Sequence, residues 1–170
     1  MGYTIHIYKA FEFLVDFFRS IPPIALFPLF MLFLGIGELS KLGVPFYGCV
    51  LVIIINSMYG VVNSSDLRRL LGKVYGFKRK QIFIKIVFPD ALPQIFVGLR
   101  TAISLALVLT IVVEMFIGSE NGLGKKIYDY HLLFDTPEMY AAIIITGIIG
   151  FTLNKGFIKL EQKIVHWKGK

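Results

Sequence analysis

Long apolar stretches dominate the pattern of hydrophobic and polar positions along the chain. A helix that crosses a bilayer needs about 20 mostly apolar residues. The stretches that meet this requirement are residues 21–39, 44–62, 99–117 and 140–158. The first contains Pro22, Pro23 and Pro28, which a membrane tolerates when neighbouring helices satisfy the freed backbone groups. Because the stretches lack the inside–outside alternation of barrel strands, the pattern predicts an all-α polytopic bundle of about four transmembrane spans.

Composition agrees with a membrane protein. The chain is 56% hydrophobic and 17% charged, with a mean hydropathy of +0.72, whereas soluble domains contain about 25% charged residues. Its 170 residues fit a single domain, since domains usually have about 100–200 residues. Residues 1–20 mix aromatic and charged side chains without a cleavable signal. They are expected to form either an interfacial helix or the end of a longer element.

The distribution of charge predicts an orientation. The net charge is +7, and the basic residues gather in segment 63–85 and from Lys155 onward, while acidic residues prevail in segment 118–138. The positive-inside rule therefore predicts a cytoplasmic 63–85 loop and C-terminus and an external 118–138 segment. It also places Lys41 in a short external turn. Because the bilayer explains the basic residues, no nucleic-acid partner is expected.

The loop after residue 63 has the pattern of an amphipathic helix. Within residues 66–80 the apolar positions follow the spacing i, i+3, i+4, i+7, i+8. This apolar stripe consists of Leu67, Leu70, Leu71, Val74 and Tyr75. It predicts a helix with a basic opposite face, which Asp66 caps as an acid at the positive end of the dipole and which Gly76 ends. Such a helix suits an anionic lipid surface or the groove of a partner protein.

The residues after this helix carry a recognisable spacing. Nine residues separate Gly76 from Ile86, and Pro89 follows with Phe88 before it. This spacing resembles the cytoplasmic loop of the permease subunits of ATP-binding-cassette (ABC) importers, which reads Glu-Ala-Ala, three residues, Gly, nine residues, Ile-x-Leu-Pro. Further blocks resemble the nitrate, sulfonate and taurine branch of that family: IPPIALFPLF (21–30), GIGELSK (35–41), PDALPQIFVGLRTA (89–102) and VVEMFIGSENGLG (112–124).

The resemblance implies a type I importer permease in the plasma membrane of a prokaryote. Segment 63–93 would then be a coupling loop that binds a separate ATPase subunit, so the chain itself would be neither an enzyme nor the holder of a cofactor. An extracytoplasmic solute-binding protein and a second permease copy would be further partners. The residues expected to couple to the ATPase are Leu67, Leu70, Leu71, Gly72, Val74, Tyr75, Gly76, Ile86 and Pro89.

Two departures from the family pattern leave an alternative open. Leu70, Leu71 and Gly72 stand where the family has Glu-Ala-Ala, so the acidic residue is missing. The family also has two spans upstream of residue 21, where this sequence offers only residues 1–20. The chain is therefore expected to be either a transporting permease or a truncated or degenerate one that serves as a non-transporting membrane anchor or interaction protein.

Polar residues within the predicted spans are the remaining candidates. Glu114 either lines the solute pathway or a gate, or sits at the external interface, because a carboxylate at mid-span costs roughly 2.5–3.5 kcal/mol. Asn56 and Ser57 either contact solute or form helix–helix hydrogen bonds. Arg100 is expected to snorkel to the cytoplasmic headgroups. No metal site is expected, because the histidines are scattered at positions 6, 131 and 166.

Overall fold

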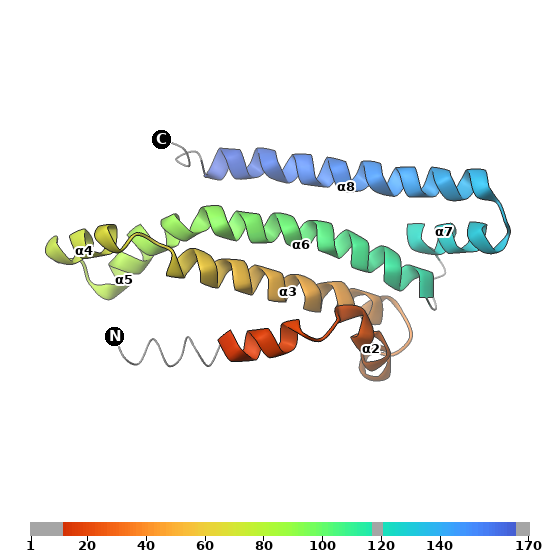
Figure 1. The fold of residues 1–170 in the computed structure, drawn as a ribbon, viewed down its shortest axis with the longest axis horizontal. Helices are drawn as coiled ribbons and strands as arrows, with labels where there is room; N and C mark the ends of the chain where they lie inside the picture. Colours follow the sequence, from red (N-terminus) through yellow and green to blue (C-terminus); the bar gives the residue numbers. More distant parts are fainter. Residues whose placement is uncertain (1–11, 117–120, 166–170) are drawn as a thin grey trace.

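The computed structural model describes residues 12–116 and 121–165, and its described elements are helical (Figure 1). Three helices are long and apolar enough to cross a membrane: α3 (Glu38–Val62), the continuous helix Arg79–Phe116 and α8 (Thr136–Ile164). They run side by side along the long axis of the molecule, with the middle helix in contact with both others. Three of the four predicted spans are thus confirmed, and the protein is an all-α, multi-pass membrane bundle.

The apolar stretch 21–39 does not form one straight span. The helix Glu12–Arg19 ends before Pro22, and the chain continues as the short 3-10 helix η1 (Pro23–Leu26) and α2 (Phe27–Leu34). The two halves are bent by 80°, because proline lacks the N–H that a continuous helix requires and its ring clashes with the preceding turn. The prediction of a span over 21–39 is therefore wrong in its bounds; a fourth crossing requires residues 12–34 together.

The start of α3 also differs from the prediction. Gly35, with a φ of +80°, follows the end of α2, and α3 begins at Glu38. Lys41 therefore lies within the first turns of α3 and not in a turn between helices. Its side chain is only 7% exposed and pairs with the Glu38 carboxylate at 2.5 Å. The prediction failed because the glycines, and not the charged residues, separate the two helices.

Small residues bring α3 against α6 (Phe88–Phe116). A methyl group added at Gly98 of α6 would lie 2.5 Å from Cβ of Asn56, and one added at Gly60 of α3 would lie 2.9 Å from the Ala91 carbonyl oxygen. Membrane helices associate through such close backbone approaches. A buried cluster continues this interface toward α2 and consists of Phe27, Val44, Leu109 and Val113.

The last two helices pack more loosely. α7 (Leu123–Leu132) lies inside segment 118–138, which the sequence predicts only as a loop, and it contacts both α6 and α8. α8 touches α6 at few points, among them Phe157 against Phe96 with ring centroids 5.6 Å apart. Only 6% of the most apolar stretch of α8 is buried. Most of its apolar surface is therefore left for lipid or for another subunit.

Candidate functional site

The segment that joins α3 to α6 forms a compact unit at one end of the bundle, the α4 end (Figure 1). It contains α4 (Asp66–Val74), α5 (Arg79–Ile82) and the π-helix η2 (Phe83–Val87). The predicted amphipathic helix is thus present, but its N-cap is Ser65 and not Asp66. Ser65 has non-helical dihedrals and its Oγ accepts a hydrogen bond from the Arg68 backbone N–H at 3.4 Å. Asp66 follows as the acid of the first turn.

Gly76 ends this helix as predicted. Its φ of +74° lies in the left-handed region that side chains rarely adopt. The Phe77 N–H bonds to the carbonyl of Gly72, and the Gly76 N–H bonds to that of Lys73, each at 3.0 Å. These bonds satisfy the last carbonyl groups of α4. The glycine therefore lets the chain leave α4 and enter α5 within a few residues.

The apolar stripe of α4 faces away from the rest of the protein. Its five side chains are between 47% and 77% exposed. Gly72, in contrast, is buried: a methyl group added there would lie 2.7 Å from Cδ1 of Ile86. The structure thus brings two of the predicted coupling residues together at the inner face of α4. A contiguous apolar patch on a short polar helix is typical of a binding surface.

Asp90, in the first turn of α6, is a residue that the sequence did not single out. Its side chain is 9% exposed, and its carboxylate pairs with Nη1 of Arg68 at 2.6 Å. It also accepts a hydrogen bond from the Ser65 backbone N–H at 3.3 Å. Next to this pair, Lys85 and the predicted coupling residue Pro89 line a shallow cavity of about 370 Å³. Spacing gives no signal for such a contact, because the paired residues are 22 positions apart in the sequence.

Arg69 holds α4 against the end of α3. Its Nη2 donates hydrogen bonds to the Val61 carbonyl oxygen and to Oγ of Ser64, and Ser64 itself is buried. Its Nη1 also pairs with Asp66 at 3.4 Å. α4 therefore has one basic residue directed to α3 and another, Arg68, directed to α6.

Asn56 lies in the interface between α3 and α6. Its Oδ1 accepts a hydrogen bond from Nε2 of Gln94 at 3.0 Å, and its Nδ2 donates to the Val52 carbonyl oxygen at 2.8 Å. Helix–helix hydrogen bonding, one of the two expected uses of this residue, is thus present. The neighbouring Ser57 is half-buried on α3. A solute contact by Asn56 or Ser57 stays a prediction.

Glu114 lies at the other end of α6, the α7 end of the bundle. Its Oε2 accepts a hydrogen bond from the Gly124 backbone N–H at 2.8 Å, in the first turn of α7. The carboxylate thereby meets unpaired N–H groups and the positive end of the α7 dipole. Gly124 permits this approach, because a methyl group there would lie 2.2 Å from the Ile111 carbonyl oxygen. A pathway or gate role for Glu114 stays a prediction.

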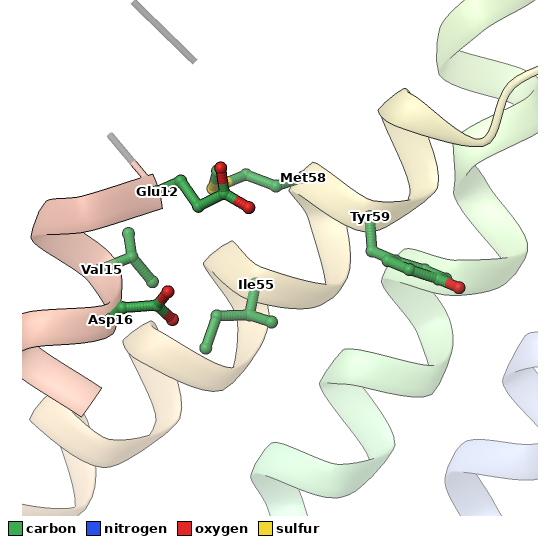
Figure 2. Close-up of a pocket in the computed structure, with 6 residues that line it drawn as sticks. All are labelled: Glu12, Val15, Asp16, Ile55, Met58 and Tyr59. Atoms are coloured by element: carbon green, nitrogen blue, oxygen red, sulfur yellow. The ribbon is translucent and has the colours of Figure 1, made fainter. Parts of the chain in front are cut away.

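Two cavities lie between the N-terminal segment and α3. The first, of about 140 Å³, holds the carboxylates of Glu12 and Asp16 beside Met58 and Ile55 of α3 (Figure 2). Asp16 pairs with Arg19 at 3.3 Å. The second, of about 210 Å³, is lined by Arg19 and by apolar residues of α3 and α6. Residues 12–19 therefore lie along α3, and residues 1–11 lie outside the described residues. The two interpretations of segment 1–20 stay predictions.

Among the described residues, no group of three potential metal-ligating side chains occurs. His6 and His166 lie outside the described residues.

Apolar spanning helices joined by a short amphipathic helix define a multi-pass membrane protein with an exposed apolar patch at one end. Residues 5–158 match the family of binding-protein-dependent transport system inner membrane components. Because this match covers most of the 170 residues, the chain belongs to that family, as its sequence resemblance predicts.

Three similar relatives carry permease names. A protein of Methanocaldococcus jannaschii, named provisionally as an ABC transporter permease, is 32% identical over 99% of this chain and 63% of its own length. A nitrate import permease protein of Synechocystis sp. is 32% identical over 97% of the chain and 60% of its own length. The taurine transport system permease protein of Escherichia coli is 27% identical over 92% and 57%. These names denote permeases and not ATPases, in agreement with the prediction that the chain is not an enzyme.

The matches cover most of this chain but a smaller share of each relative. The chain spans about three-fifths of the length of the curated relatives that it matches. The α4 unit, Asn56 and Glu114 all fall within the matched residues 5–158.

Proposed function

We propose that this chain is the membrane-spanning permease subunit of an ABC importer and that α4 docks onto a separate ATPase subunit. The observation that carries this proposal is the exposed apolar stripe of α4. Its five side chains are exposed although the helix itself is anchored to α3 through Arg69, to α6 through Arg68 and to η2 through Gly72. An amphipathic helix that is fixed on its polar side and solvent-exposed on its apolar side suits insertion into a partner's groove.

The α4 end is assigned to the cytoplasm, where ATP is available. Segment 63–85 carries seven basic residues against Asp66 alone, while the segment around α7 carries Glu120, Asp129, Asp135 and Glu138 against Lys125 and Lys126. Such asymmetry sets the orientation of membrane proteins through the basic residues of short loops. The ATPase would then meet α4 inside, and an extracytoplasmic solute-binding protein would meet the α7 end outside.

A second copy of the permease completes the proposed transporter. The outward apolar surface of α8 is available to lipid or to that copy. ATP binding would close the pair of ATPase subunits and push the two α4 helices, so that the pathway between the permeases turns outward to accept solute. Family membership supports this mechanism, which requires no nucleotide site in this chain.

The proposed solutes are small and mostly anionic compounds, such as nitrate or a sulfonate, including the zwitterionic sulfonate taurine. The names of the relatives support this class. The described spans nevertheless offer few fixed cations. Arg100 is half-buried near the middle of α6, Lys155 lies 4.9 Å over the Phe151 ring, and Lys41 is paired with a carboxylate. We therefore assign selectivity to the solute-binding protein, because a tight anion site in the pathway would slow release.

Charge insertion into the stripe tests the docking proposal. We expect Leu71→Asp and Val74→Asp to release the ATPase from membranes, by at least about thirtyfold in affinity if either side chain is a hot spot worth about 2 kcal/mol. Membrane insertion of the permease should remain normal. Lys73→Asp is the control, because it places the same carboxylate on the same helix outside the stripe. It changes the net charge by two units and not one, so it is the stricter test of charge alone.

The outcomes separate the transporting permease from its alternative. Intact co-purification of the ATPase with both stripe variants would refute docking through α4. A chain that co-purifies with no ATPase at all would favour the non-transporting anchor, for which the replacement of Glu-Ala-Ala by Leu70, Leu71 and Gly72 is the specific argument.

A further inference from the structure

The contacts of Asp90 join two helices that the chain connects only indirectly. The covalent route from α4 to α6 passes through a glycine turn, α5 and the π-helix η2. Asp90 bypasses this route, because it binds the Arg68 side chain and the Ser65 N–H at the N-terminal end of α4 directly. We call these three residues the Asp90 clamp.

The clamp works together with a second contact farther along α4. Gly72 packs against Ile86 of η2, close enough that a methyl group would collide. A single contact would leave α4 free to pivot about it, whereas two contacts at different positions fix both the place and the direction of the helix. The exposed apolar stripe is thus presented on a helix that cannot easily turn relative to α6.

The burial of Asp90 distinguishes the clamp from an ordinary surface ion pair. Exposed ion pairs contribute little, but the Asp90 side chain is 9% exposed while Arg68 is 62% exposed. The carboxylate is therefore held in place by two donors at the start of α4. Because it is buried, water has little access to replace either donor. Removal of either donor leaves a poorly hydrated acceptor at the base of α6.

We infer that Asp90 is a positioning residue that makes α4 and α6 move as one body, so that force applied to α4 reaches the spanning helices. This inference rests on the proposed docking of an ATPase at α4. It adds that docking and coupling are separable: the stripe binds the partner, and the clamp transmits the movement. Loss of the clamp should leave the ATPase bound but its hydrolysis poorly linked to transport.

The rigidity of α4 can be measured on the full chain alone. Spin labels at Lys73→Cys on α4 and Thr101→Cys on α6, both exposed, are placed in a Cys49→Ala background in lipid nanodiscs. We expect Asp90→Ala to broaden the distance distribution at least about twofold, because α4 then samples further orientations. Asp66→Asn is the matched control, since the Asp66 ion pair with Arg69 lies within α4. Equal widths for Asp90→Ala and the control would overturn the clamp.

Coupling is measured with the ATPase that co-purifies with the unchanged chain. In vesicles supplied with nitrate or taurine and the solute-binding protein, Asp90→Ala should lower uptake per ATP hydrolysed by roughly fivefold or more, the lower range of typical coupling effects. Asp90→Asn keeps one oxygen acceptor for the two donors and should lose less. Unchanged uptake per ATP in Asp90→Ala would refute the inference, while retention of the ATPase by both Leu71→Asp and Val74→Asp would refute the proposed function instead.

Discussion

A single methyl group at Gly98 should separate α3 from α6. In Gly98→Ala the new Cβ would start 2.5 Å from Cβ of Asn56, whereas carbon atoms prefer about 3.5–4.0 Å. Because both atoms are attached directly to helix backbones, no rotamer change relieves the contact. The helices must move apart by about 1 Å, and the 3.0 Å hydrogen bond from Gln94 to Asn56 would then be lost or weakened.

The expected change in the free energy of unfolding is the balance of opposing effects. Overpacking costs about 1–3 kcal/mol, and an interhelical hydrogen bond in a membrane contributes about 0.6 kcal/mol on average. Alanine is favoured over glycine in a helix by about 1 kcal/mol, which offsets part of the loss. The matched control is Gly147→Ala in α8, where no atom lies within 4 Å of the new methyl group. The two variants should differ by about 2 kcal/mol, or roughly thirtyfold in the unfolding constant.

Cys49 supplies the assay. It is the only cysteine of the chain, and its Sγ lies 3.1 Å from the Ala102 carbonyl oxygen in the same interface. A fluorescent maleimide that reacts with Cys49 during denaturation in mixed micelles therefore reports directly on the separation of α3 from α6. Gly98→Ala should unfold at lower denaturant than the unchanged chain, and Gly147→Ala at equal or higher denaturant. A Gly98→Ala midpoint at or above that of Gly147→Ala would refute the packing argument.

Two further predictions concern orientation and Glu114. In a Cys49→Ala background, Leu133→Cys after α7 should react with an impermeant maleimide in intact cells, and Lys73→Cys on α4 only after permeabilisation; the reverse pattern would overturn the assigned orientation. Glu114→Gln keeps an acceptor for the Gly124 N–H but loses a charge at the α7 N-terminus worth about 0.3–1 kcal/mol, so uptake should slow by roughly twofold to fivefold. The rank order of nitrate, taurine and an alkanesulfonate should not change, and a changed order would show that the permease itself selects solute.

Features that depend on local sequence were predicted well. The spans α3, α6 and α8 follow from continuous hydropathy, and α4 follows from a stripe at helical spacing with Gly76 at its end. The sequence does not predict α7, because this short helix carries several charged residues and contains no long apolar stretch. The break at Pro22 was underestimated, since local composition shows that a proline is tolerated but not how far the helix axis bends.

Contacts between distant residues could not be predicted. Asp90 is 25 residues from Ser65, and Glu114 is 10 residues from Gly124; neither pair shares a helix or a periodic pattern. The sequence does show that Glu114 and Asp90 are acids near apolar stretches, and such residues usually have a partner. The identity of that partner depends on the packing of α4 and α7 against α6, which one sequence does not contain.

Asp90 and Glu114 lie near opposite ends of α6, and their loss should therefore change ATP hydrolysis and uptake in different ways. Asp90 is the third residue of Phe88–Phe116 and Glu114 is the third from its end, so they are about 36 Å apart along a regular helix. α6 also contacts α3, α7 and α8, so movement of α4 that reaches α6 can reach the other spanning helices. Loss of Asp90 weakens the link between α4 and α6, so hydrolysis should continue while uptake falls. Loss of the Glu114 charge weakens the contact between α6 and α7 at the other end of the bundle, so hydrolysis and uptake should fall together. The ratio of uptake to hydrolysis therefore distinguishes a defect in the link between α4 and α6 from a defect in the movement of the spanning helices.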